Sequence, residues 1–162
     1  MLQFYYRFVA PYHSILELGR IDTVMRLIET QFSLYVGDCW EHLCRQYVSG
    51  NEIDGIIYNM ASRWWGKIFP NDNKEGTMIE LDIVAESFDK KHILIGECKW
   101  TNGEDAQRLA HSLSEKAQSL PFVKREQQVH LVLFLKRTPE HPEAARYFLP
   151  ENIVSSHAFR RE

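Results

Sequence analysis

Apolar residues near the N-terminus recur at helical spacing in two successive stretches. In residues 22–36, one helical face carries Val24, Leu27, Ile28, Phe32 and Tyr35. Gly37 interrupts this pattern, and Asp38 is a residue type that commonly caps the N-terminus of a helix. A second apolar stripe then runs as far as Gly50, with Glu41 at its border. The pattern predicts a lead-in and a helix over residues 1–37, and a second helix that starts at Asp38.

Four later stretches have the composition of strands, and a helix is expected between the last two of them. The strands are predicted at 62–69, 77–86, 92–100 and 128–136. The short connection SFDKKH indicates that the second and third strands form an antiparallel hairpin. The helix is expected at about 104–119, capped by Asn102. The last strand is almost entirely apolar, which is typical of a strand covered on both faces.

The predicted elements follow one another as helix, strand, strand, strand, helix, strand. A strand that follows a crossover helix is expected to be a parallel partner inside the sheet. We therefore expect an α/β sandwich with a mixed central sheet, in a single domain overall. Its core would span residues 38–140. A short helix at 142–149 and a tail would make up residues 141–162.

Charged residues interrupt the apolar face of the third strand at its C-terminal end. Side chains alternate along a strand, so Glu97 and Lys99 share the face marked by Ile93 and Ile95. Cys98 would point the other way. On the second strand, the same alternation places Glu80, Asp82 and Val84 on one face and Ile79, Leu81 and Ile83 on the other.

A hairpin that turns at Asp89–Lys90 would set Asp82 opposite Glu97 and Glu80 opposite Lys99. Two facing carboxylates repel each other unless one is protonated or a cation lies between them. A divalent ion such as Mg²⁺, which binds carboxylates and phosphates, would resolve this repulsion. A lysine beside such a site could contact a phosphate during phosphodiester hydrolysis. The alternative is structural: Glu80 and Lys99 form a salt bridge, and the other two carboxylates face water.

Composition places only broad limits on function. The chain of 162 residues has a formal net charge of −3 and 25% charged residues, so the totals give no sign of nucleic-acid binding. No apolar run approaches the length of a membrane helix, and the N-terminal stretch is aromatic and does not have the basic and then apolar pattern of a signal sequence, so a cytoplasmic location is expected. Trp64 and Trp65 are adjacent in a strand, so one is expected in the core and the other could stack on a base.

The helix with Glu41, the strand with Asp82 and the strand with Glu97-x-Lys99 resemble the PD-(D/E)XK nuclease superfamily, whose core has the order αβββαβ. More narrowly, several stretches look like the domain of unknown function at the C-terminal end of archaeal and bacterial DExx-box-type ATPases. These stretches are FYYRFVAP, YVGDCWEHLCRQYV, RWWGK, IELDIVA and IGECKW. The resemblance covers roughly residues 4–136 and implies a restriction-endonuclease-like three-layer sandwich with an extra N-terminal helix.

The resemblance also implies residue roles. Asp82 and Glu97 would bind Mg²⁺ or Mn²⁺, joined by the backbone carbonyl of Cys98. Lys99 would be the catalytic lysine, and Glu41 would hold a metal, in some nucleases through water. The leading Pro of the motif is absent here, because Glu80-Leu81 precedes Asp82. No residue is assigned to substrate binding.

Two functions remain open at this point. The first is a Mg²⁺-dependent endonuclease that hydrolyses DNA. The second is a catalytically silent nuclease-fold module that serves as a regulatory or interaction domain of an ATPase. The chain has no GxxxxGK[ST] phosphate-binding loop, so ATPase and winged-helix regions would lie in a longer protein or act in trans. Substrate preference and the formation of a homodimer stay undetermined.

Overall fold

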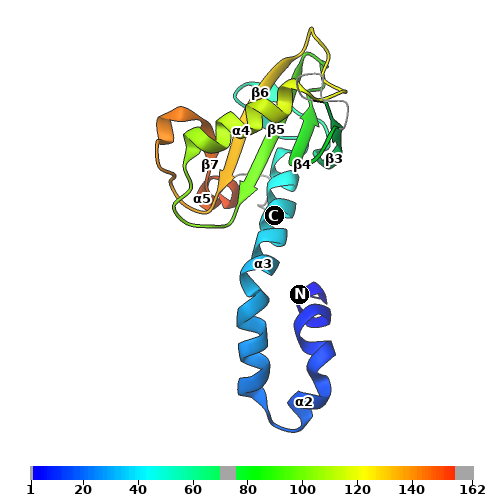
Figure 1. Ribbon diagram of the computed structural model, residues 1–162, viewed down its shortest axis with the longest axis vertical. Coiled ribbons are helices and arrows are strands. Elements are labelled where there is room, and N and C mark those ends of the chain that lie inside the picture. Colours follow the sequence, from blue (N-terminus) through cyan, green and yellow to red (C-terminus); the bar gives the residue numbers. More distant parts are fainter. Residues whose placement is uncertain (1, 70–75, 156–162) are drawn as a thin grey trace. The chain divides into compact units, whose positions relative to one another are not determined.

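The computed structural model describes residues 2–69 and 76–155. The chain forms two compact units, Met1–Asp38 and Cys39–Glu162. Helix α3 (Ile21–Val48) belongs to both, and Figure 1 shows it continuing from the helical first unit into the α/β unit. Although α3 has 28 residues, no helix in the described part of the chain is long and apolar enough to cross a membrane.

The first unit is a helical hairpin held by aromatic side chains. Short helical turns precede α3: α1 (Leu2–Phe4), η1 (Tyr5–Val9), η2 (Ala10–Tyr12) and α2 (His13–Glu17). Phe8 is buried, and its ring contacts those of Phe4 and Tyr35. The guanidinium of Arg7 lies over the Tyr35 ring and donates to the carboxylate of Asp38 at 2.8 Å. These contacts close the hairpin onto the first half of α3.

The expected break at Gly37 does not occur. Gly37 lies inside α3, and Asp38 pairs with Arg7 instead of capping a new helix. Glycine inside a helix costs only about 1 kcal/mol relative to alanine. The apolar residues on either side of Gly37 pack within their own units, so this cost does not end the helix.

The second unit is built on a five-stranded mixed sheet of order β3-β4-β5-β6-β7. Its strands are β3 (Ser62–Ile68), β4 (Thr77–Glu86), β5 (His92–Lys99), β6 (Gln128–Leu135) and β7 (Arg146–Phe148). β4 and β5 form the predicted antiparallel hairpin, and β6 is the predicted parallel partner of β5. A separate two-stranded sheet of β1 (Glu52–Ile53) and β2 (Ile56–Ile57) was not predicted.

Each face of the sheet carries its own buried core, and Figure 1 shows α4 lying across one face. On one face, Trp40, Cys44 and Tyr47 of α3 pack on strand residues such as Leu94 and Phe134. On the other face, α4 (Ala106–Gln118) buries Leu113 and Ala117 against the sheet. This arrangement explains why β5 and β6 are apolar on both sides.

Two predicted boundaries are wrong. Helix α4 begins at Ala106, and its cap is Asp105, whose carboxylate accepts hydrogen bonds from the backbone N–H groups of Gln107 and Arg108; Asn102 is not the cap. The expected helix at 142–149 is instead a 3₁₀ turn, η4 (Pro142–Ala144), followed by strand β7. A short helix, α5 (Pro150–Val154), comes after it. Pairing with β6 makes residues 146–148 extended, because the sheet edge offers them backbone partners.

The predicted alternation along β4 also fails at one point. Leu81 packs on the α4 side of the sheet and Ile83 on the α3 side, although they were expected on the same face. The cause is a β-bulge: Ser62 pairs with Val84, whereas Trp64 pairs with Leu81, so β4 has one extra residue here. Asp82 lies between the two residues that change faces.

Candidate functional site

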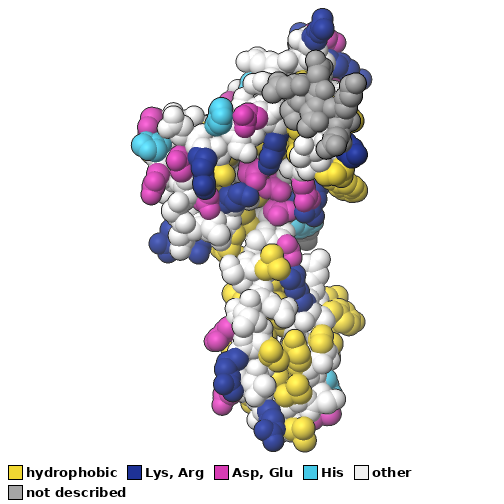
Figure 2. Space-filling model, in the orientation of Figure 1, with side chains coloured by type: hydrophobic (Ala, Val, Ile, Leu, Met, Phe, Trp, Pro, Cys, Tyr) yellow, Lys and Arg dark blue, Asp and Glu magenta, His cyan; other side chains and the backbone are white. Residues whose placement is uncertain are grey.

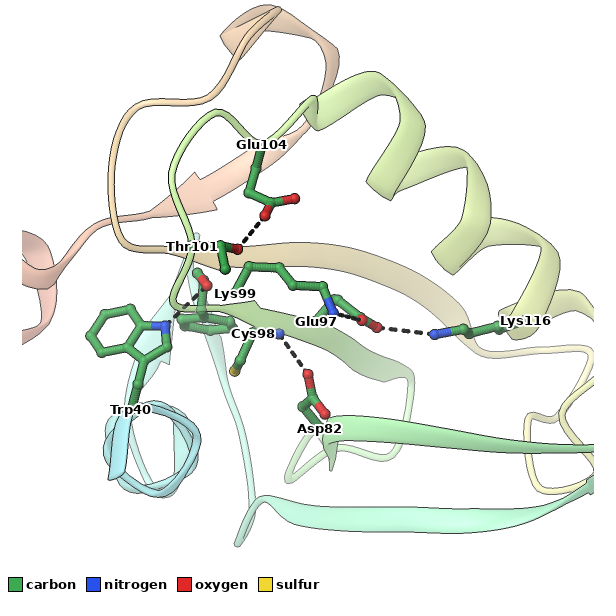
Figure 3. A network of polar contacts seen from close by, with 9 residues as sticks. Trp40, Asp82, Glu97, Cys98, Lys99, Thr101, Glu104 and Lys116 are labelled. Carbon is green, nitrogen blue, oxygen red and sulfur yellow. Dashed lines mark hydrogen bonds and ion pairs between the residues drawn. The ribbon is translucent and has the colours of Figure 1, made fainter. Parts of the chain in front are cut away.

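Asp82 lies where the β4–β5 ladder stops. The paired residues run from Glu86↔Ile93 to Ile83↔Gly96, which is the predicted register and makes Asp82 and Glu97 the next pair. At that point the Asp82 side chain takes the place of backbone pairing, because its Oδ2 accepts the backbone N–H of Cys98 at 2.7 Å. The bulge lies on the β3 side of Asp82, and this contact lies on the β5 side. The Asp82 carboxylate is therefore at the point where the pairing of β4 with β5 ends, which we call the fork (Figure 3).

The electrostatic surroundings of Asp82 make its charge costly. Its pKa is raised from 3.8 to about 6, first because the carboxyl is largely buried and then because Glu97 and Glu41 are negatively charged. The Cys98 N–H and the Lys99 ammonium lower the pKa but do not offset these effects. The predicted conflict between facing carboxylates is therefore present, and Glu41 adds to it.

Glu97 is held between two lysines. Its Oε1 lies 2.7 Å from Nζ of Lys99, which is two residues further along β5 on the same face. Its Oε2 lies 3.1 Å from Nζ of Lys116, which comes from α4 (Figure 3). Only 13% of the Glu97 side chain is exposed, so both ion pairs are partly shielded from water.

Arg45 joins Glu41 to the fork. On α3, Arg45 lies one helical turn after Glu41, and its Nη1 is 3.4 Å from the Glu41 carboxylate. The same Nη1 donates to the backbone carbonyl of Asp82 at 2.9 Å. Trp40 fixes this part of the helix, because its indole N–H donates to the Phe134 carbonyl of β6 at 3.1 Å. Glu41 is thereby directed toward Asp82.

The structure brings the four predicted side chains, Glu41, Asp82, Glu97 and Lys99, to one region of the sheet. The backbone carbonyl of Cys98 also faces the fork, because the N–H and C=O groups of a strand residue point toward the same neighbouring strand. The predicted alternative, a salt bridge between Glu80 and Lys99, does not form. Glu80 pairs with Arg63 on β3, and Lys99 pairs with Glu97.

Sequence reasoning missed Arg45 and Lys116. Both had a signal in the sequence. Arg45 follows Glu41 by four residues on a predicted helix, which is the spacing of an ion pair. Lys116 lies in the inward-facing stripe of α4, directly before the buried Ala117. A charged residue in such a stripe indicates a buried partner, and here the partner is Glu97.

These residues match a Mg²⁺ or Mn²⁺ site in the kind of atoms that they offer. Both ions prefer oxygen ligands, and the fork combines carboxylates with a backbone carbonyl. The raised pKa of Asp82 shows that further positive charge would be stabilising there. As they stand, the described residues contain no group of three or more His, Cys, Asp or Glu side chains placed to hold a metal ion. Both oxygens of Glu97 are engaged by lysines, Oε1 by Lys99 and Oε2 by Lys116, so neither oxygen is free to bind a metal ion.

The surface around the site is mixed in charge. Figure 2 shows Asp and Glu side chains gathered on the α/β unit in the region of β4 and β5, with Lys and Arg side chains around them. On neighbouring β3, Trp64 packs inward on Phe122, and 67% of Trp65 is exposed. Of the two tryptophans, Trp64 is therefore partly buried against the core and Trp65 faces outward.

Comparison with known proteins identifies one family. The DUF234 family, described as archaeal and bacterial proteins of unknown function, matches residues 5–116. This range includes most of the first unit, the second unit as far as Lys116, and every side chain of the site. No curated protein and no solved structure matches the chain.

Proposed function

The chain belongs to the DUF234 family of archaeal and bacterial proteins of unknown function, and from its site we propose that it is a metal-dependent nuclease-like domain that hydrolyses DNA phosphodiester bonds. We propose with it that the second unit is a restriction-endonuclease-like sandwich. Apart from the separate β1–β2 sheet, the succession of α3, the strands β3, β4 and β5, α4 and β6 supports the fold, since it is the order αβββαβ.

The observation that carries the proposal is the Asp82 carboxyl at the fork. Burial and two neighbouring carboxylates raise its pKa to about 6, and it lies at a bulge that interrupts the sheet. Groups with such strongly perturbed pKa values, and β-bulges, are concentrated at functional sites. A protein that needed only stability would be better served here by asparagine, whose neutral amide oxygen could still accept the Cys98 N–H.

Each residue then has a definite part. Asp82, Glu97, the Cys98 carbonyl and Glu41 would hold Mg²⁺ or Mn²⁺, Glu41 directly or through water. The ion would supply positive charge to the phosphodiester and would make an attacking water more acidic. Lys99 would orient that water and stabilise the negative charge that develops on the phosphate. Arg45 and Trp40 keep the Glu41 segment against the fork through their contacts with backbone carbonyls.

A catalytically silent module of an ATPase is the second candidate. The observation that favours it is the pairing of Glu97 with two lysines, which balances the carboxylate without any metal ion. In this case the partners would be ATPase and winged-helix regions, in the same protein or in trans. The net charge of −3 also suits a domain that depends on other regions to hold DNA.

The two candidates are separated by a cleavage assay. The chain is incubated with plasmid, branched and single-stranded DNA in Mg²⁺, in Mn²⁺ and in a chelator. Cleavage is expected only with the metals, and Asp82→Asn should reduce its rate by roughly a hundredfold or more. Glu115→Gln, an exposed carboxylate on α4, is the matched control and should leave the rate unchanged.

Two outcomes of this assay would count against nuclease activity. Cleavage that is equal in Asp82→Asn and in the parent protein would come from a contaminant or another site, and would refute the nuclease proposal. Absence of cleavage in every condition, in protein that is folded by circular dichroism, would favour the silent module.

A further inference from the structure

Lys116 is a partly buried lysine on α4, and no part in the proposed nuclease has been given to it so far. It lies between Leu113 and Ala117 on the face of α4 that packs on the sheet, and only 26% of its side chain is exposed. Its Nζ is 3.1 Å from Oε2 of Glu97. Lysine is rarely placed on the inner face of a helix, because the ammonium loses water there. The position therefore requires a reason beyond helix packing.

Charge balance at Glu97 does not supply that reason. Lys99 already lies 2.7 Å from Oε1, and one ammonium is enough to neutralise one carboxylate. With Lys116, the site's three carboxylates (Glu41, Asp82 and Glu97) are matched by three cations (Arg45, Lys99 and Lys116), so a divalent ion bound there would leave a surplus of positive charge. An extra cation beside a carboxylate is suited to an anionic ligand, and phosphate is the anion that the proposed function would bring.

The two lysines also differ in how they are attached. Lys99 is on the same strand as Glu97, and its Nζ lies nearer to the carboxylate, at 2.7 Å compared with 3.1 Å for Lys116. Lys116 reaches Glu97 from another element, and four rotatable bonds allow its ammonium to leave Oε2 while its stem stays against the sheet. Lys116 is therefore the ion-pair partner that can be exchanged.

We propose that Lys116 neutralises Glu97 while no metal ion is present and binds a phosphate oxygen of DNA once a divalent ion takes Glu97. The proposal rests on the proposed function, and it adds a second DNA-binding cation to Lys99. A purely structural ion pair between α4 and β5 would hold the helix in place and would have no such relation to metal or DNA.

Competition with the metal ion and a purely structural ion pair predict different effects on metal binding. Mn²⁺ is titrated into the protein alone, without DNA, by calorimetry. If Lys116 competes with the ion for Glu97, then Lys116→Met should bind Mn²⁺ more tightly, by roughly three- to tenfold. Lys116→Arg keeps the positive charge and should bind Mn²⁺ as the parent protein does. Arg108→Met removes an exposed cation from the same helix and is the matched control, with unchanged affinity expected.

DNA binding supplies the second readout. The probe is a labelled single-stranded oligonucleotide in Ca²⁺, with affinity measured by fluorescence anisotropy. Lys116→Met should bind it roughly tenfold more weakly, and its dependence on salt should be shallower by about one ion. Opposite changes in Mn²⁺ and DNA affinity would support the proposal. Unchanged or weaker Mn²⁺ binding by Lys116→Met, with an unaltered melting temperature, would overturn it.

Failure of this proposal is distinguishable from failure of the nuclease function. A parent protein that binds Mn²⁺ and DNA but cleaves nothing would refute nuclease activity, while the binding measurements would still decide the role of Lys116. Mn²⁺ binding that Asp82→Asn leaves unchanged would mean that the ion is held elsewhere, and this result would overturn the role of Lys116 directly.

Discussion

At the scale of single residues, Gly96 shows how closely the site is tied to the packing beneath it. A Cβ atom at Gly96 would lie 3.0 Å from Cβ of Ile83 and 3.1 Å from Cε2 of Phe134. Both neighbours are fully buried, so neither has room to move. Gly96→Ala should lower the free energy of unfolding by about 1–3 kcal/mol, as overpacking does in other cores. Urea denaturation measures this value, and an unchanged midpoint would show that the core yields at this point.

Asp82 should make stability depend on pH in a metal-free protein. Its pKa is about 6 in the folded state and 3.8 ordinarily, so the fold favours the protonated form. The stability that this preference gives is present below about pH 4 and is lost as pH rises through about 6. The full difference between the two pKa values corresponds to roughly 3 kcal/mol, and partial contact with water reduces it to about 2 kcal/mol.

Asp82→Asn tests this expectation, because an amide oxygen can still accept the Cys98 N–H but carries no charge. With a chelator present, the variant should be more stable than the parent protein by about 2 kcal/mol at pH 8. The gap should close below about pH 4. Urea denaturation at three pH values measures it. A difference that stays constant with pH would mean that the Asp82 carboxyl is not strained by its neighbours.

Hairpin register and strand alternation are local properties, and they were sufficient to bring Asp82, Glu97 and Lys99 together. Glu41 was joined to them only by the resemblance to a nuclease superfamily. The sequence was not sufficient for the detailed contacts. The bulge at Asp82 depends on how β3 pairs with β4, and no pattern within the sequence of β4 predicts it. The side chain of Asp82 therefore points into a fork that strict alternation does not contain.

At the scale of elements, Gly37 should limit the stability of α3. It is inside the helix, and a Cβ atom there would meet nothing within 4 Å. Gly37→Ala should therefore raise the free energy of unfolding by about 0.5–1 kcal/mol. Thermal denaturation followed at 222 nm, a wavelength typical of helix, measures it. Gly50 is the matched control, since its φ of +71° is strained for alanine, and Gly50→Ala should lower stability. A loss of stability in Gly37→Ala would contradict the continuous helix.

The elements were predicted well where their apolar pattern was long. The four expected strands and α4 are present, with ends shifted by a residue or two. The failures are short or depend on context. The break at Gly37 was inferred from a local preference that the packing on both sides outweighs. β7 has only three residues, and it is extended because β6 offers a partner.

At the scale of the whole molecule, the candidate site belongs to one unit. Glu41, Asp82, Glu97, Lys99 and Lys116 all lie after Asp38, in the unit Cys39–Glu162. The first residue in either buried cluster of the sheet is Trp40. The first unit has its own aromatic contacts, and it exposes large apolar side chains such as Leu18, Ile21 and Leu34. Figure 2 shows hydrophobic side chains on the surface of this unit. Because the buried clusters of the sheet contain no residue of the first unit, we expect the second unit to fold without it.

A shortened chain tests this independence. A fragment of residues 33–162 removes most of the first unit but keeps the turns of α3 before Trp40, with Ser33 as a new N-cap. It should unfold cooperatively, and its free energy of unfolding should lie within about 1 kcal/mol of that of the second unit in the full chain. Its affinity for Mn²⁺ should agree with that of the full chain within roughly twofold, because every proposed ligand is retained. A fragment that lacks a cooperative transition would show that the first unit supports the sheet. A folded fragment that no longer binds Mn²⁺ would show that the first unit contributes to the site, and would separate that contribution from stability.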